Sequence, residues 1–139
     1  MSLRTFPLLL ATAFLVSVGS LQAQAQSNDG KFDADQIEQL VAPIALYPDD
    51  LLTQTLMAAT YPLEIVQAKR WRDANKSLKG TALDEAMAAQ RWDPSVKSLI
   101  VFPETLGMMN DNLDWTQDLG DAVLGQQQEV MDAVQRMRA

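Results

Sequence analysis

Four proline-containing turns constrain the fold of this chain most, because each predicts where a helix begins. Each combines an aromatic residue, a proline and at least one acid within four positions; they are Tyr47-Pro48-Asp49-Asp50, Tyr61-Pro62-Leu63-Glu64, Trp92-Asp93-Pro94 and Phe102-Pro103-Glu104. Proline suits the first helical position because its missing N–H would have no partner there, and an acid in the first turn interacts favourably with the helix dipole. The turns therefore predict short helices that begin at these points.

Apolar residues between the turns recur three and four positions apart, which is the spacing of one helix face. Ile37, Leu40 and Val41 follow this pattern after Asp33, a good N-cap with Gln36 three positions on. No segment alternates with period two over the length of a strand. We therefore predict an all-α fold, a single small domain over residues 33–139 with about seven to eight short helices. We expect helices near 33–42, 49–60 and 62–75, then helical starts at Thr81, Pro94, Pro103 and Asn112, and a last helix through Val130 and Met137 after a break at Gly125.

Three of the turns carry an aromatic residue directly before the proline, namely Tyr47, Tyr61 and Phe102. We expect these rings to anchor the turns in the core, so that truncating Phe102 would cost about 3 to 5 kcal/mol. An exposed ring would instead make the turn a candidate platform for a ligand.

Residues 1–25 have the pattern of a secretory signal peptide. Arg4 gives a positive start, an apolar run covers residues 8–16, and Ala23-Gln24-Ala25 is a small-x-small cleavage site. The apolar run is shorter than the ~20 residues that a membrane-spanning helix needs. We expect cleavage between Ala25 and Gln26, export to the periplasm, no transmembrane span after cleavage, and a disordered mature start over residues 26–32.

The residue types that are missing limit the chemistry of the chain. The sequence contains no His and no Cys, so it lacks the commonest general base near neutral pH, the commonest metal ligand and any disulfide. Its formal net charge is −7, and an acidic chain repels nucleic acid. We predict no catalytic residue, no cofactor, no metal and no nucleic-acid partner.

One acidic segment has the spacing of a calcium-binding loop without the residues that close one. Oxygen-bearing side chains fall at relative positions 1, 3, 5, 7, 9 and 12 from Asn110 to Asp121. Position 6, where glycine makes the sharp turn, is Trp115, and position 12 is Asp121 where a longer Glu is expected. We therefore expect no calcium site here.

Two groups of side chains are candidate binding residues. The first is basic and consists of Lys69, Arg72, Lys76 and Lys79, spaced three and four apart. Such a stripe could contact anionic envelope polymers or lipid head groups, but a solvated helix face that pairs with neighbouring acids is the favoured explanation.

The second group combines aromatic residues with acids, and Trp92, Glu64 and Glu104 represent it. Aromatic platforms beside carboxylates suit a glycan, and two suitably separated carboxylates can hydrolyse a glycosidic bond. The same acids also fit as first-turn residues of helices, and the aromatics as the apolar parts of the turns. Both explanations stay open.

Four strings at these turns are distinctive in themselves; they cover residues 40–49, 61–66, 92–97 and 112–117. They closely resemble a bacterial envelope family, the domain of unknown function 3300 (DUF3300), over roughly residues 35–138. The resemblance implies a signal-bearing protein of Gram-negative bacteria, with no activity, ligand or catalytic residue to transfer. It also implies that members continue into a region rich in Pro, Tyr and Gly, so that this chain would supply only the helical part.

These observations give two hypotheses. The first is an exported, non-enzymatic helical module that binds another cell-envelope component, either a protein or an envelope polymer. The alternative is a carboxylate-based glycan-binding or glycan-hydrolysing protein of the periplasm. The two differ in whether replacing Glu64 or Glu104 by Gln abolishes a turnover activity.

Overall fold

The computed structural model describes residues 31–139, so the expected signal peptide and most of the expected disordered segment lie outside the described residues. Between residues 31 and 139 the chain forms eight α-helices and one short 3₁₀ helix, and no strand, which confirms the all-α prediction. The helices are α1 (Ala34–Val41), α2 (Asp49–Ala58), α3 (Pro62–Ala74), α4 (Gly80–Ala88), α5 (Pro94–Ser98), η1 (Leu99–Val101), α6 (Pro103–Asp111), α7 (Leu113–Gly125) and α8 (Gln127–Arg138).

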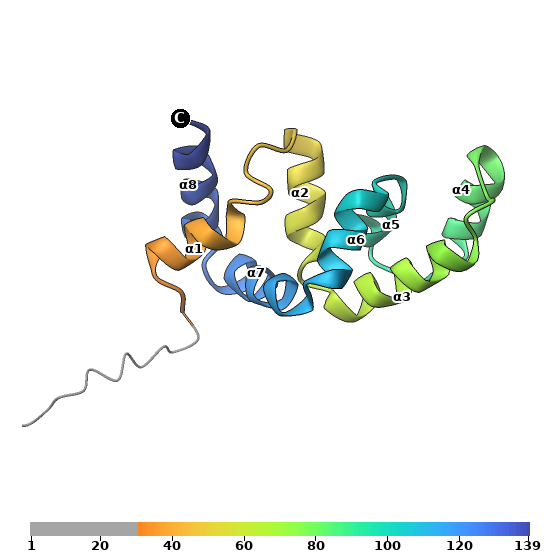
Figure 1. Ribbon diagram of the computed structural model, residues 1–139, viewed down its shortest axis with the longest axis horizontal. Coiled ribbons are helices and arrows are strands. Elements are labelled where there is room, and N and C mark those ends of the chain that lie inside the picture. The colour runs from red at the N-terminus through yellow and green to blue at the C-terminus, as the bar shows by residue number, and fades with distance from the viewer. Residues whose placement is uncertain (1–30) are drawn as a thin grey trace, which may run out of the picture.

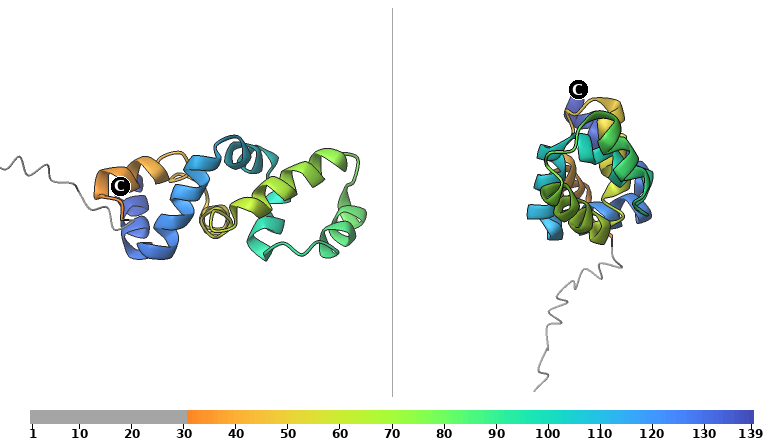
Figure 2. Two further views of the ribbon diagram at one scale, coloured as in Figure 1. Left: turned by 90° about the horizontal axis from the view of Figure 1, so that it is seen from below. Right: turned by 90° about the vertical axis from the view of Figure 1, so that its right-hand side faces the viewer.

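The helices form an elongated body (Figures 1 and 2). Helices α1 and α8 pack together at one end, α2 and α7 lie in the middle, and α3 extends toward α4 at the other end. Helix α7 packs against α1, α2, α3, α6 and α8, whereas α4 makes the fewest contacts with other elements. The middle of the molecule is therefore organised around α7.

Proline opens three of the helices as predicted. Pro62, Pro94 and Pro103 occupy the first turns of α3, α5 and α6. Pro48 differs, because it is the N-cap of α2 and the helix begins one residue later, at Asp49. The turns thus mark helix starts to within one residue.

The start of α1 was also predicted in detail. The Asp33 carboxylate accepts a hydrogen bond from the Gln36 backbone N–H (2.8 Å), and the Gln36 side chain accepts one from the Asp33 N–H (2.9 Å). This reciprocal pair is a capping box, which satisfies backbone donors that the first turn leaves without partners.

One predicted cap, Thr81, is wrong, and another, Asn112, is confirmed in its position only. Helix α4 begins before Thr81, at Gly80, whose φ of +58° lies in the left-handed region that favours glycine. Asn112 does occupy the N-cap position of α7, but its side-chain amide donates to the Met108 carbonyl (2.9 Å) at the end of α6. Neither helix start has a side-chain cap hydrogen bond.

The core is built from aliphatic residues contributed by nearly every helix. The largest fully buried side chains are Ile37, Val41, Ile44, Ile65, Val96, Leu99, Ile100, Leu106, Met109, Leu119, Val130 and Val134. The predicted aromatic anchors are mostly absent from it: Tyr61 is 41% exposed and Phe102 is 43% exposed, and only Tyr47 is half-buried against the core. The prediction was wrong for Tyr61 and Phe102 because they precede the first helical turn, while Ile65 and Leu106 inside the helices take the buried positions.

Long-range hydrogen bonds hold the first described residues and the last helix to the body. The side-chain amide of Gln126 forms hydrogen bonds with the backbone of Phe32, the last residue of the segment expected to be disordered. The Arg138 guanidinium donates to the Ala45 and Tyr47 carbonyls, each at 2.6 Å, and to the Asp49 carboxylate. None of the helices in residues 31–139 is long and apolar enough to cross a membrane.

Candidate functional site

The four basic residues expected to form a stripe are divided between a helix and a loop. Lys69 and Arg72 lie on α3, which ends at Ala74, and Lys76 and Lys79 follow in the connection to α4. The expected single helix face therefore does not extend beyond Arg72, because the helix ends before Lys76.

Lys69 and Arg72 have partners within the domain. Lys69 pairs with Asp73 (2.7 Å), which lowers the pKa of that carboxyl. Arg72 donates to the Asn75 carbonyl (3.0 Å) and the Leu78 carbonyl (3.1 Å), and so holds the connection that follows its own helix. These two cations stabilise local structure.

Glu64 and Asp93 are neighbours in space, and each carboxylate accepts a hydrogen bond from a backbone N–H group. The Glu64 carboxylate accepts a hydrogen bond from the Asp93 N–H (3.1 Å). The Asp93 carboxylate caps α5 by accepting from the Ser95 N–H (2.9 Å) and hydroxyl (2.7 Å). These hydrogen bonds lower the pKa of Asp93, and the negative charge of Asp93 raises the pKa of the neighbouring Tyr61 hydroxyl.

The aromatic residues at this point pack on each other. The rings of Trp71 and Trp92 meet edge to face, with centroids 5.6 Å apart and planes at 78°, and Trp92 is only 9% exposed. Such a pair joins α3 to the segment before α5 and offers little free ring surface for a sugar. Glu104, the other predicted acid, lies exposed in the first turn of α6, so the structure does not bring it into the hydrogen-bonded group of Glu64 and Asp93.

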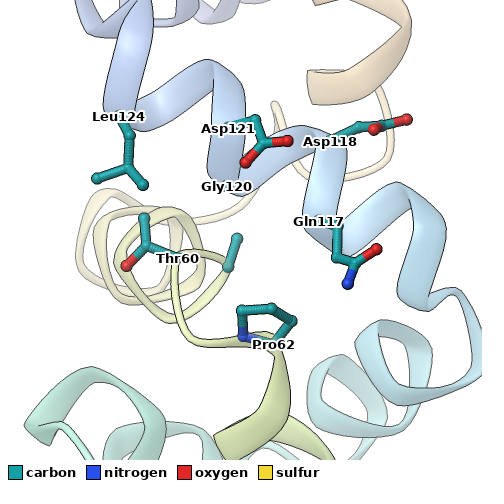
Figure 3. A pocket seen from close by; sticks show the side chains of 8 residues that line it. Thr60, Pro62, Gln117, Asp118, Gly120, Asp121 and Leu124 are labelled. Atoms are coloured by element: carbon teal, nitrogen blue, oxygen red, sulfur yellow. The ribbon is translucent and has the colours of Figure 1, made fainter. Parts of the chain in front are cut away.

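A groove that the sequence did not predict runs between α7 and the junction of α2 with α3. It consists of two hollows of about 420 and 250 Å³, which share Pro62 and Gln117 as lining residues. In Figure 3, Leu124 and Gln117 project from α7 toward Thr60 and Pro62, whereas Asp118 points away from this hollow. We call this feature the α7 groove; it is lined by Ala59, Thr60, Pro62, Leu63, Val66, Leu113, Gln117, Asp118, Gly120, Asp121 and Leu124.

The floor of the α7 groove exists because residue 120 has no side chain. A Cβ atom built on Gly120 would lie 2.2 Å from the carbonyl oxygen of Ala59 and 2.8 Å from its carbonyl carbon. Only glycine therefore lets α7 approach the end of α2 this closely. The floor of the groove is therefore set by the close packing of the α7 backbone on the end of α2.

Three leucines stand exposed around the groove. Leu63 is 69% exposed, Leu124 is 73% exposed and Leu113 is 38% exposed. A soluble monomer rarely gathers large exposed apolar side chains around one depression unless the surface contacts something. The α7 groove is therefore the best candidate for a binding surface in residues 31–139.

An acidic stripe borders the groove on α7. Asp114, Asp118 and Asp121 are spaced i, i+4 and i+7, so they share a side of the helix. All three are exposed, and the ion pairs found within residues 31–139 involve other acids, namely Asp73, Glu38 and Asp49.

The three acids also belong to the segment with calcium-loop spacing. This segment is helical from Leu113 onward. No group of three possible metal-ligating residues is found among the described residues.

A second hollow of about 430 Å³ lies on the other side of α7. It is lined by Phe32, Gln36, Gln39, Leu40, Trp115 and Asp118. Its tryptophan is held in place, because the Trp115 indole N–H donates to the Leu40 carbonyl (2.9 Å). Half of these lining residues belong to α1, so this hollow marks the seam between α1 and α7.

Sequence reasoning missed the α7 groove because it searched for charged and aromatic residues. The signal was present as two leucines, Leu113 and Leu124, that fall outside the core-facing set Trp115, Leu119 and Ala122 on the same predicted helix. Apolar residues off the core face of an amphipathic helix indicate a second contact. Their partners across the groove, Pro62 and Leu63, are distant in sequence.

The fold and the site define an all-α domain with a solvent-open groove along its central helix. The chain belongs to the protein family of unknown function DUF3300, whose model matches residues 33–139. It is 52% identical over 107 residues to "Uncharacterized protein YacH" of Escherichia coli (strain K12). This match covers 77% of the present chain and 17% of the relative, so the chain spans about a sixth of the length of that protein. No solved structure matches the chain.

Proposed function

We propose that this chain is an exported, non-enzymatic helical module that binds another cell-envelope component through the α7 groove. One observation carries the proposal: three exposed leucines surround a contiguous depression whose floor is fixed by the contact of Gly120 with Ala59. A depression with a fixed floor needs less reorganisation to accept a partner, which favours affinity.

The pattern of residues 1–25 supports export. Fractionation of cells that produce the full chain, followed by intact-mass measurement, tests this part of the proposal. We expect periplasmic material that begins at Gln26. Material that still carries Arg4 after fractionation would contradict the proposed localisation.

The hydrogen bonds of Glu64 and Asp93 support a non-enzymatic role over the glycan alternative. Both carboxylates are engaged with backbone N–H groups that the fold must satisfy. The structure also does not bring Glu64 and Glu104 into one group, as a pair of carboxylates that hydrolyses a glycosidic bond would require.

Incubation of the mature protein with peptidoglycan fragments, followed by chromatography of the products, separates the two functions. We expect no turnover by the wild-type protein. Turnover that is lost in a folded Glu64→Gln or Glu104→Gln variant would establish the glycan-hydrolysing alternative and overturn the non-enzymatic proposal.

A further inference from the structure

We infer that the occupant of the α7 groove is an amphipathic helix of another envelope protein whose apolar face is flanked by Lys or Arg. The inference rests on the proposed function and specifies the chemistry of the partner. It follows from three properties of the groove: its walls, its apolar residues and its charged border.

The walls favour a helix as the occupant. One wall is α7 and the other is the end of α2 with the first turn of α3, and residues 31–139 offer no strand edge that could pair with an extended peptide. Grooves between helices are typically filled by the apolar face of another helix. Leu113 and Leu124 are eleven residues apart on α7, which corresponds to about 16 Å, or three turns of a docked helix.

The apolar residues determine which side of that helix is buried. Leu63 and Leu113 line one hollow and Leu124 the other, with Pro62 and Gln117 between them. A partner with apolar side chains at i, i+3 or i+4, and i+7 would present one apolar stripe to both hollows.

The charged border determines the polar side of the partner. Asp118 and Asp121 lie at the edge of the groove on α7, and Asp114 continues the same row of acids toward the start of the helix. Cationic residues flanking the apolar face of a docked helix would meet these carboxylates, whereas acidic residues there would be repelled. The formal net charge of −7 for the whole chain acts in the same direction at longer range.

The same charges disfavour a second copy of this chain as the occupant. A symmetric dimer through the groove would place the two acidic stripes against each other, because an isologous interface uses the same patch on both subunits. They also disfavour an anionic lipid surface, which carries the same sign of charge.

Binding is tested with three labelled 14-residue helical peptides that share a leucine face and differ in their polar residues, which are Lys, Gln or Glu. Fluorescence anisotropy with the mature protein should give binding in the order Lys, then Gln, then Glu, and the affinity of the Lys peptide should fall with added salt. Binding of the Gln peptide as tightly as the Lys peptide would overturn the inference about charge and leave the apolar groove of the proposed function in place.

Variants locate the binding site. All chosen side chains are exposed, so the fold should be retained, and circular dichroism verifies it. The pair Leu63→Ala and Leu124→Ala should weaken binding of the Lys peptide about tenfold or more, while Leu46→Ala, at an 81% exposed leucine before α2, should leave it unchanged. Equal binding by the leucine pair and the wild type would overturn both this inference and the proposed function.

Acid variants test the border. Asp121→Asn should weaken binding of the Lys peptide about two- to fivefold, Asp118→Asn should weaken it less because its side chain points outward at the edge, and Asp84→Asn on α4 should have no effect. If all three substitutions weakened binding equally, the net charge of the chain and not the position of the acids would explain the attraction, and the inference would be overturned. Dimerisation in sedimentation, or attachment to phosphatidylglycerol vesicles, would overturn it in favour of the other occupants if either depended on Leu124.

Discussion

The side-chain amide of Gln126 forms two hydrogen bonds with the backbone of Phe32, accepting from its N–H (2.7 Å) and donating to its carbonyl (2.9 Å). The two residues are 94 positions apart, and Gln126 is itself largely buried between α7 and α8. This amide therefore fixes the residue that precedes the capping box of α1. It joins the first described residues to the junction between α7 and α8.

Gln126→Ala should release Phe32. We expect the variant to lose about 1 to 3 kcal/mol of unfolding free energy, because each hydrogen bond contributes about 0.5 to 1.5 kcal/mol. Hydrogen exchange should show that the Phe32 amide loses its protection, while Gln127→Ala at the adjacent exposed position leaves it unchanged. Retained protection of Phe32 in Gln126→Ala would show that the contact does not hold this segment.

Two glycines within helices should respond oppositely to alanine. Gly120→Ala should destabilise by about 1 to 3 kcal/mol or more, since its Cβ would meet the Ala59 carbonyl, a backbone group that cannot turn aside. Gly107→Ala in α6 should stabilise by about 0.5 to 1 kcal/mol, because the nearest atom is the flexible end of Lys69 at 3.7 Å. Urea melts provide the comparison, and equal effects of the two substitutions would contradict the close approach of α7 to α2.

Phe102 should contribute little to stability. Because its ring is 43% exposed, we expect Phe102→Ala to cost less than about 1.5 kcal/mol, below the range for a buried aromatic. Leu106→Ala, at a fully buried position in α6, the helix that Phe102 precedes, should lower the unfolding free energy by about 2 to 5 kcal/mol. A larger loss for Phe102 than for Leu106 in urea melts would place the ring in the core after all.

Asp93 should make stability depend on pH in the acid range. Its hydrogen bonds with Ser95 lower its folded pKa below the unfolded value of about 3.9. The resulting stabilisation is complete above the unfolded pKa and is lost as the pH falls through the folded pKa. Asp93→Asn keeps a residue that caps well but removes the titration.

The difference in unfolding free energy between wild type and Asp93→Asn should therefore be constant above pH 5 and should shrink as the pH falls below 4. Denaturant melts at closely spaced pH values measure it. A difference that stayed constant from pH 7 to pH 2.5 would show that this carboxylate does not titrate differently on folding.

The sequence predicted those features of the fold that depend on neighbouring residues. The capping box of Asp33 with Gln36, the helix starts at Pro62 and Pro103 and the end of α7 at Gly125 were all visible locally. Features set by distant residues were not visible. No local pattern predicts that Gln126 binds Phe32, because the two residues are 94 positions apart and meet only in the folded chain.

The candidate site was less predictable than the fold. The sequence predicted Trp92, Glu64, Glu104 and four basic residues, Lys69, Arg72, Lys76 and Lys79. The structure engages Glu64, Trp92, Lys69 and Arg72 in internal contacts. The α7 groove depends on Gly120 meeting Ala59 across the junction of two helices, a contact that only the packing order reveals. A glycine within a helix is the one local hint of such an approach.

The central claim is that the α7 groove is the surface through which this chain binds its partner. The most direct measurement is site-specific photo-crosslinking in cells, with the photoreactive residue placed at Leu63, at Leu124 or at Leu46 beyond the opposite end of α2. We predict adducts from positions 63 and 124 whose crosslinked segment, read by mass spectrometry, has apolar residues at helical spacing flanked by Lys or Arg. Adducts that form equally from position 46, or that join two copies of this chain at position 124, would contradict the claim.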